Sequence, residues 1–260
     1  MNRLHHPSGV AAFFDVDGTL ISFPSLERRL FRALLWRRAI PVRNFALWAA
    51  EAVRLAPRGI AELRQANKMY LRGVSAEVAA AVAERVVEAA SVEFFPEGVE
   101  RVAWHGSQGH RIVLVSGTLG LLAARAARSL EKSLARRGVR AAIAVCATRL
   151  EGAGGRWTGR VVGPAMFGAA KAEAIQSLAE RMELDLGACF AYGDSVHDRA
   201  MLECVGHAMA VNPSPEMRRV AVREGWRVVE WSAAGSGMGK AAGLRGLRPA
   251  LQGLATRKAK

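Results

Sequence analysis

Two aspartates, Asp15 and Asp17, follow the apolar run "VAAFF" one residue apart, and a Gly-Thr pair comes directly after them. In an extended chain, side chains two residues apart project to the same side. Two carboxylates this close repel each other, and the repulsion raises the pKa of one of them. A divalent cation bound between them would remove the conflict, so this spacing is typical of a metal-dependent site.

A second pair of aspartates, Asp194 and Asp198, follows another apolar run in the sequence "GDSVHD". Taken alone, either pair also fits a plain structural role, because Asp-Gly is a turn sequence and Asp-Ser a helix cap. Together, each after a buried strand, the two pairs favour a shared cation. Ligation by a few carboxylate oxygens is what Mg²⁺ prefers.

Groups that could bind an anion stand between the acidic pairs. Ser116, Gly117 and Thr118 follow a third apolar run and precede a helical pattern, so they could hold a phosphate at a helix N-terminus. The same sequence is also typical of an ordinary N-cap. Lys171 opens another helix after a glycine-rich stretch. Its compact ammonium suits a phosphoryl oxygen beside a metal, although a solvated lysine is the plain alternative.

Short apolar runs alternate with helical patterns, which predicts a mostly parallel sheet covered by helices on both faces. Ligands bind beyond the carboxyl ends of such strands, where the residues above stand. The helical pattern between residues 22 and 90 is too long for a crossover, so it is predicted to form a separate cap. A hairpin is predicted over 149–162. The predicted strands span 10–14, 112–115, 142–147, 188–192, 207–211 and 227–230.

Four motifs resemble, in order, those of the haloacid dehalogenase superfamily: Asp15-x-Asp17-Gly-Thr, Ser116-Gly-Thr, Lys171 and Gly193-Asp194-Ser-x-x-Asp198. The helical insert and the hairpin look like the cap of subfamily IB, which includes the phosphoserine phosphatases. The resemblance runs from about residue 10 to residue 231. It implies an α/β, Rossmann-like core at 1–21 and 91–235 and a helical cap at 22–90. The basic stretch 236–260 lies outside it, and its composition is compatible with disorder.

The family's chemistry implies a role for each motif. Asp15 would be the nucleophile that forms an aspartyl-phosphate, and Asp17 would protonate the leaving oxygen and then activate water. Mg²⁺ would bind Asp15, the backbone carbonyl of Asp17, and Asp194. Asp198 would support the metal through its waters or through Lys171. The transferring phosphate would be held by Ser116, Gly117 and Lys171.

The resemblance thus implies a Mg²⁺-dependent phosphatase acting on a phosphate monoester of a small molecule or a lipid. Phosphoserine phosphatases bind the amino acid with a glutamate shortly after the first motif and an arginine in the cap. Here the first acid is Glu27, and Asn67 stands near the arginine position with Arg64 close by. Both departures argue against phosphoserine. The alternative is a non-catalytic protein on this fold that binds anions, a membrane or nucleic acid, but the complete set of motifs favours the enzyme.

The formal net charge of the chain is +14. Between residues 22 and 72 there are eleven basic and three acidic residues. This surplus indicates contact with an anionic membrane, or only arginine-rich, solvated helix faces. Nucleic acid is not expected, because nothing resembles a groove-reading helix or a base-stacking sheet. Trp36 and Trp48 are expected to pack against the helices, and His197 to lie on an exposed loop.

The three cysteines have no CxxC spacing, the N-terminus has no signal-peptide pattern, and no charge-free run approaches the roughly 20 residues that span a bilayer. These features predict a cytoplasmic protein with reduced thiols.

Overall fold

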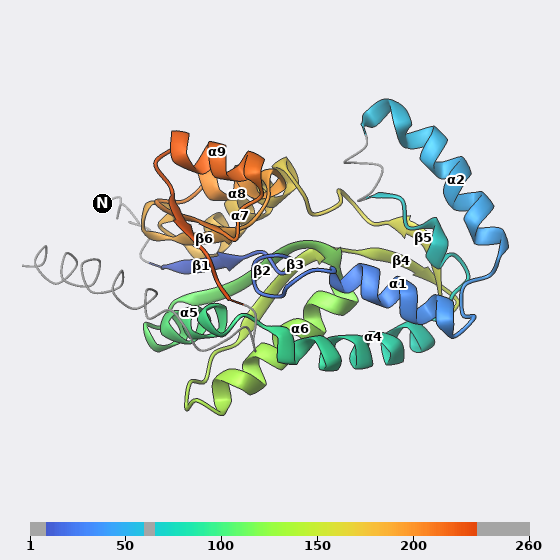
Figure 1. The fold of residues 1–260 in the computed structure, drawn as a ribbon, viewed down its shortest axis with the longest axis horizontal. Helices are drawn as coiled ribbons and strands as arrows, with labels where there is room; N and C mark the ends of the chain where they lie inside the picture. Colours follow the sequence, from blue (N-terminus) through green and yellow to red (C-terminus); the bar gives the residue numbers. More distant parts are fainter. Residues whose placement is uncertain (1–8, 60–65, 233–260) are drawn as a thin grey trace, which may run out of the picture.

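The structure is a computed structural model that describes residues 9–59 and 66–232. The predicted basic tail at 236–260 and Arg64 lie outside the described residues. Within them, the chain forms a central sheet with helices on both faces and a helical segment that follows the first strand (Figure 1).

Six strands form the central sheet, and each pair of neighbours is parallel. Their order is β3-β2-β1-β6-β7-β8, which places β1 in the interior (Figure 1). The parallel α/β architecture predicted from the alternating pattern is therefore confirmed. The strands are β1 (Ala11–Phe14), β2 (Arg111–Leu119), β3 (Ile143–Thr148), β6 (Phe190–Gly193), β7 (His207–Val211) and β8 (Arg227–Val229).

The register of the sheet brings three strand ends to one edge. Phe14, the last residue of β1, lies opposite Leu114 of β2 and Tyr192 of β6. The pairing continues one step further, because the backbone N–H of Asp15 donates to the Tyr192 carbonyl over 2.9 Å. Residues that follow these positions therefore emerge side by side.

Helices cover both faces of the sheet, and each face has its own hydrophobic core. Phe14 packs in the same core as Leu130 of α6, whereas Phe13 packs in the core that contains Ile175 of α7. Burial on both faces explains why the strands are continuous apolar runs. One face carries α5 (Pro96–Ser107) and α6 (Gly120–Ala135), and the other carries α7 (Ala169–Met182), α8 (Arg199–Glu203) and α9 (Pro215–Arg223) (Figure 1).

Residues 22–90, called the insert below, lie between β1 and α5. Helix α1 packs against α4, and α4 packs against α6. Leu30 of α1 and Val82 of α4 belong to the same core as Phe14, so this part of the insert is built onto one face of the sheet. Its helices are α1 (Leu26–Trp36), α2 (Arg43–Leu55) and α4 (Ala76–Ala90), with the short 3-10 helices η1 (Ala56–Arg58) and η2 (Met69–Leu71).

The predicted hairpin is confirmed as β4 (Leu150–Ala153) and β5 (Arg156–Val161). It packs against the insert although it lies far away in the sequence. The backbone N–H of Gly73 donates to the carbonyl of Trp157 over 2.7 Å, and the N–H of Trp157 donates to the carbonyl of Val74 over 3.0 Å. The hairpin and the insert are thus joined by backbone hydrogen bonds.

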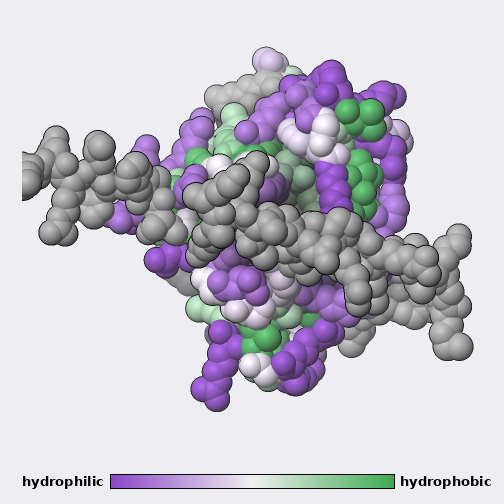
Figure 2. Space-filling view, turned by 90° about the vertical axis from the view of Figure 1, so that its left-hand side faces the viewer, coloured by the Kyte–Doolittle hydropathy of each residue, from purple (hydrophilic) through white to green (hydrophobic). Residues whose placement is uncertain are grey.

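The end of the molecule away from the insert shows mainly hydrophilic residues, with hydrophobic ones in separate areas (Figure 2). None of the described helices is long and apolar enough to cross a membrane.

The three cysteines are free thiols, as expected, and the Sγ of Cys189 accepts a hydrogen bond from the N–H of Ala11 at 3.2 Å.

Candidate active site

The carboxyl ends of β1, β2 and β6 meet around a cavity of about 380 Å³. Phe23, Ser25 and Glu27, at the start of the insert, also line it. The structure brings together in this one cavity all the residues that the motifs single out: Asp15, Asp17, Ser116, Gly117, Lys171, Asp194 and Asp198.

Lys171, in the first turn of α7, joins two of the aspartates. Its Nζ lies 2.6 Å from Asp15 Oδ1 and 2.5 Å from Asp198 Oδ1. All three side chains are buried. The alternative that Lys171 is an ordinary solvated lysine on a helix is therefore wrong. Burial lowers the pKa of Lys171, but the charges of Asp15 and Asp198 raise it by more. The lysine therefore stays an ammonium between two carboxylates.

Asp198 is held in place from its other side. Its Oδ2 accepts hydrogen bonds from the backbone N–H of Asp194 at 3.2 Å, the N–H of Ser195 at 3.0 Å and the Ser195 hydroxyl at 3.1 Å. Burial raises the pKa of Asp198, but Lys171 and Ser195 outweigh it and the pKa is lowered. Ser195 also caps the short helix η5 (Val196–Asp198), so the local cap and the site share the same residues.

Asp15, Asp194 and Asp198 form a cluster in which one oxygen from each lies within 4.8 Å of the others. Burial, opposed by Lys171, raises the pKa of Asp15 to about 7. Burial and the charges of Asp198 and Asp15 raise the pKa of Asp194 to about 9. Lys171 alone does not balance this negative charge. Buried carboxylate oxygens with an excess of negative charge fit a hard divalent cation such as Mg²⁺.

The Asp17 side chain makes a different contact. Its Oδ1 accepts a hydrogen bond from the backbone N–H of Leu26, the first residue of α1, at 2.7 Å. Burial raises the pKa of Asp17 to about 6, although the Leu26 amide opposes the shift. Asp17 is therefore a partly buried carboxyl, held by the insert, that can exchange a proton near neutral pH.

Glycine is required in the turn after Asp17. Gly18 has a φ of +93°, and a Cβ at this position would overlap the carboxylate of Asp194. The Asp-Gly turn considered as a structural alternative is thus present. It also lets the backbone after β1 approach the carboxylate at the end of β6.

Helix α6 begins directly after this motif, as expected, but neither Ser116 nor Thr118 is its N-cap. Strand β2 continues through Leu119 and α6 begins only at Gly120, so Ser116, Gly117 and Thr118 are extended. The pairing with β3 shifts register between Ser116 and Leu119, which is a bulge-type irregularity at the strand end. The Thr118 hydroxyl is buried without a hydrogen-bond partner in the described part of the chain. An anion here would be held by the end of β2 and its hydroxyls.

Glu27 is a cavity residue that the motifs did not identify. Its Oε1 accepts hydrogen bonds from Lys68 Nζ at 2.7 Å and from the Tyr70 hydroxyl at 2.9 Å, and its Oε2 lies 2.8 Å from the same Nζ. Lys68 and Tyr70 are buried. Asn67 makes a different contact and donates to the Trp48 carbonyl at 2.8 Å. The sequence signal was the position of Glu27 as the first acid after the first motif.

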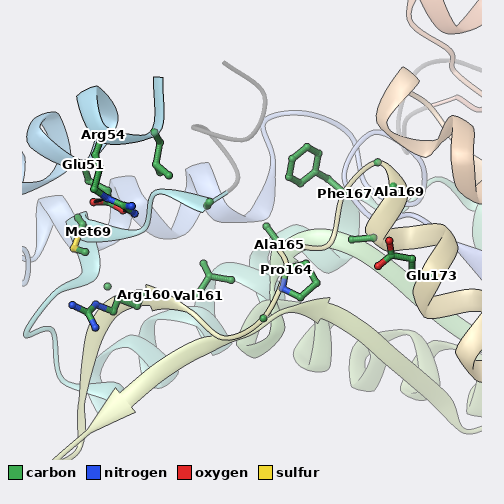
Figure 3. Close-up of a pocket in the computed structure, with 16 residues that line it drawn as sticks. Glu51, Arg54, Met69, Arg160, Val161, Pro164, Ala165, Phe167, Ala169 and Glu173 are labelled. Atoms are coloured by element: carbon green, nitrogen blue, oxygen red, sulfur yellow. Dashed lines mark hydrogen bonds and ion pairs between the residues drawn. The ribbon is translucent and has the colours of Figure 1, made fainter. Parts of the chain in front are cut away.

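A second, larger hollow of about 980 Å³ lies between α2, η2 and the loop from β5 to α7 (Figure 3). Arg54 of α2 and Arg160 of β5 lie on its side toward the insert, and Phe167 lies toward α7 (Figure 3). Phe167 lines both hollows, and its ring meets the exposed His197 edge-on with centroids 5.9 Å apart. His197 is exposed, as expected, and also borders the aspartate cavity. The larger hollow offers room for further parts of a ligand beside this cavity.

Comparison with known proteins agrees with these motifs. The family model of haloacid dehalogenase-like hydrolases matches residues 12–203. A Mycobacterium tuberculosis protein described as a phosphoserine phosphatase is 32% identical over 259 residues, which cover 95% of this chain and 80% of that protein. A Streptomyces azureus protein named for inhibition of morphological differentiation is 33% identical over 235 residues, covering 87% and 80%.

Solved structures share the fold. A protein of unknown function from Bordetella pertussis superposes with a TM-score of 0.66 at 29% identity, over 85% of this chain and 98% of that one. A phosphoserine phosphatase with an analogue of its phospho-aspartyl intermediate has a TM-score of 0.56 at 19% identity, over 86% and 94%. At that identity the second likeness supports the fold alone.

Proposed function

The chain belongs to the haloacid dehalogenase-like hydrolase family and is a phosphatase of that family, and we propose a mechanism for it. In this mechanism the protein hydrolyses a phosphate monoester through a phosphorylated Asp15. The observation that carries the proposal is the position of Lys171. This buried ammonium lies 2.6 Å from Asp15 and 2.5 Å from Asp198 in a cavity that Ser116 and Asp194 also line. Such a constellation suits the attack of a carboxylate on a phosphoryl group.

The reaction then has two steps. The Asp15 carboxylate attacks phosphorus, the bond from phosphorus to the leaving oxygen breaks, and Asp17 gives that oxygen its proton. Water next attacks the phosphorus of the aspartyl-phosphate, Asp17 takes the proton of the water, and Asp15 is released together with inorganic phosphate. A pKa of about 6 suits Asp17 to give and to take a proton near neutral pH.

Positive charge and hydrogen-bond donors would hold the transferring oxygens. Lys171 supplies an ammonium, Ser116 and Thr118 supply hydroxyls, and Gly117 supplies its backbone N–H. Burial fixes these groups before the substrate arrives, so little reorganisation is needed as charge develops on phosphorus. Positioning and charge neutralisation are the main sources of catalysis in phosphoryl transfer.

The residues that would hold Mg²⁺ are Asp15 and Asp194 through their carboxylates and Asp17 through its backbone carbonyl. When bound, the ion supplies positive charge that neutralises phosphoryl oxygens. Asp198 would support the site indirectly, because it fixes the ammonium of Lys171 and the backbone N–H of Asp194. This division of roles accounts for four aspartates in one small cavity.

We further propose that the insert acts as a cap. Phe23, Ser25 and Glu27 line the cavity from the insert, and the Leu26 amide holds Asp17. A cap at this position would exclude water during the attack of Asp15 and readmit it for the second step.

Phosphoserine is the second candidate substrate, favoured by the description of the M. tuberculosis relative. The Glu27 contacts argue against it. The Glu27 carboxylate is already neutralised by the ammonium of Lys68 and also accepts the Tyr70 hydroxyl. An amino-acid ammonium would have to compete with both. We therefore propose a phosphate monoester, of a small molecule or a lipid, that has no ammonium bound to Glu27.

A substrate panel tests these statements. The full chain would be assayed on an aryl phosphate, on phosphoserine and on the phosphoserine analogue without the amino group, each with Mg²⁺ and with a chelator. We expect hydrolysis that the chelator stops and no preference for phosphoserine over its analogue. Turnover that is unaffected by the chelator would contradict the metal. A strong preference for phosphoserine would assign its amino group to Glu27 and support the second candidate.

A further inference from the structure

Helix α2 carries a stripe of apolar side chains on a face that is exposed to solvent, although Leu55 of the same helix is buried. Val42, just before the helix, Phe45, Ala46, Ala49 and Val53 follow helical spacing and form one stripe. Val42 is 84% exposed, Val53 is 77% exposed and Phe45 is 39% exposed. A surface helix normally turns such a stripe toward the core, so the exposed stripe of α2 is unusual.

Polar contacts fix this orientation from the inner face. The buried Asn44 side chain donates to the carbonyls of Tyr70 at 2.9 Å and Arg72 at 2.7 Å. Asn67 donates to the Trp48 carbonyl at 2.8 Å. Helix α2 lies at the outer edge of the insert (Figure 1), and the exposure of Val42 and Val53 places its apolar stripe toward solvent. The contacts of the inner face therefore determine that the apolar stripe is exposed.

The end of α1 extends the apolar surface. Trp36 is 84% exposed and Leu35 is 44% exposed, and both stand before the short turn into α2. Trp48 of α2 is 43% exposed. The expectation that the tryptophans pack against the helices is wrong for Trp36, which is largely exposed, whereas Trp48 is partly covered. The docking face, as we call this surface below, consists of Leu35, Trp36, Val42, Phe45, Ala46, Trp48, Ala49 and Val53.

Exposed arginines accompany the docking face along the sequence, and acids do not offset their charge. The two acids between residues 26 and 55 are already engaged, Glu27 by Lys68 and Glu51 by Arg54. The exposed arginines on α1, the turn and the start of α2 are Arg28, Arg32, Arg37, Arg38 and Arg43. An apolar helix face with aromatic rings and flanking arginines is the pattern of helices that lie in the plane of a membrane interface.

We propose that the docking face binds the surface of an anionic phospholipid membrane. Its charge is complementary to anionic headgroups, and its aromatic and valine side chains can enter the boundary between headgroups and acyl chains. A second copy of this chain is the poorer partner, because a two-fold contact would place the arginines of one copy against those of the other. The proposal concerns binding alone and does not depend on the substrate of the phosphatase.

Vesicle co-sedimentation of the full chain tests the proposal. The two vesicle types are phosphatidylcholine mixed with phosphatidylglycerol, and phosphatidylcholine alone. We expect binding to the anionic vesicles alone, and weaker binding as salt shortens the Debye length from about 10 Å at 0.1 M to about 3 Å at 1 M. Equal binding to both vesicle types, binding that salt leaves unchanged, or no binding at all would overturn the proposal.

Matched arginine variants distinguish binding through the docking face from binding caused by the net charge of the protein. Replacing Arg32, Arg37 and Arg43 by Gln removes three charges beside the docking face. Replacing the exposed Arg136, Arg137 and Arg140 by Gln removes three charges around the end of α6. At about 1 kcal/mol for each basic residue near an anionic surface, the first set should weaken partitioning about 100-fold and the second far less. Equal losses from the two sets would contradict docking through this face.

A matched valine pair tests the apolar contribution. Val53→Asp changes a valine of the docking face that is 77% exposed, and Val222→Asp changes one on α9 that is 72% exposed. We expect Val53→Asp to lose vesicle binding and Val222→Asp to keep it, with phosphatase activity in solution retained in both. Sedimentation velocity supplies a further check. A concentration-dependent dimer that Val53→Asp abolishes, without vesicle binding by the parent chain, would assign the face to self-association and overturn the proposal.

Discussion

The carboxylate of Asp17 accepts a hydrogen bond from the backbone N–H of Leu26 over 2.7 Å. Leu26 is the first residue of α1, so a partly buried acid of the sheet edge is anchored by the first helix of the insert. The amide stabilises the charged form, while burial raises the pKa of the acid to about 6. The position of the insert and the proton affinity of Asp17 are therefore linked.

Asp17→Asn tests the proton transfer assigned to this residue. The asparagine side chain is similar in size to aspartate and can still accept the hydrogen bond from the Leu26 N–H. It cannot exchange a proton with substrate or water. We expect kcat to fall about 10²–10⁴-fold, the usual contribution of a positioned acid or base. An aryl leaving group needs little protonation, so a burst of aryl alcohol should precede slow turnover. Asp185→Asn, at an exposed helix cap, is the control. Near-normal turnover of Asp17→Asn without a burst would assign the proton transfer elsewhere.

Magnesium should stabilise the folded protein through the aspartate cluster. Binding to the folded state alone stabilises it by RT ln(1 + [Mg²⁺]/Kd), so Tm should rise with MgCl₂ concentration. In Asp194→Asn this rise should disappear. Without metal, the variant should be at least as stable as the parent at pH 8, because burial and the charges of Asp198 and Asp15 disfavour ionised Asp194. A full Mg²⁺-dependent rise of Tm in Asp194→Asn, measured by thermal unfolding, would place the ion elsewhere.

A buried histidine should make stability depend on pH. His105 is fully buried, with Nε2 at 2.8 Å from the Tyr192 hydroxyl and Nδ1 at 2.8 Å from Nδ1 of His110. Burial, with the charges of His110 and Arg101, lowers the pKa of His105 to about 3. The folded state thus keeps His105 neutral at pH values where the unfolded chain, with a pKa of about 6.5, binds a proton. Stability is therefore lost as the pH falls below about 6.5.

Urea unfolding at several pH values measures this loss. Between pH 7 and pH 5 the contribution of His105 should be about 2 kcal/mol of unfolding free energy. His105→Asn is expected to have a lower free energy of unfolding at both pH values. Its loss of unfolding free energy between pH 7 and pH 5 should be smaller than that of the parent chain by this amount. The exposed His207, changed to Asn, should keep the full pH dependence. An unchanged pH dependence in His105→Asn would show that other groups cause the acid sensitivity.

Much of the site could be predicted from the sequence because its chemistry is local. Asp15 and Asp194 each follow a short buried strand, Ser116 lies toward the end of another, and parallel strands bring their carboxyl ends to the same edge. The type of each residue and the direction of the sheet therefore predict the cluster without knowledge of distant contacts. Strand β2 ends at Leu119 instead of the predicted residue 115, because a sequence pattern locates the end of an element only to within a few residues.

Contacts between distant segments could not be predicted in this way. Glu27 meets Lys68 and Tyr70 across 41 and 43 residues of sequence, and no local pattern encodes that meeting. Helical spacing predicts the apolar stripe of α2, but spacing alone does not say which face turns to solvent. The inner polar contacts of Asn44 help to decide that orientation, and they form only when α2 packs against η2 within the insert.

Identification of the phosphorylated residue is the most direct test of the central claim. The parent chain and Asp15→Asn would be mixed with an aryl phosphate and MgCl₂, quenched in acid during turnover, digested and examined by mass spectrometry. We expect one acid-stable, hydroxylamine-sensitive phosphoryl group on the peptide that contains Asp15 in the parent chain. We also expect no such group, and turnover lower by several orders of magnitude, in a folded Asp15→Asn. A phosphoryl group on another residue, or full turnover by Asp15→Asn, would contradict the account.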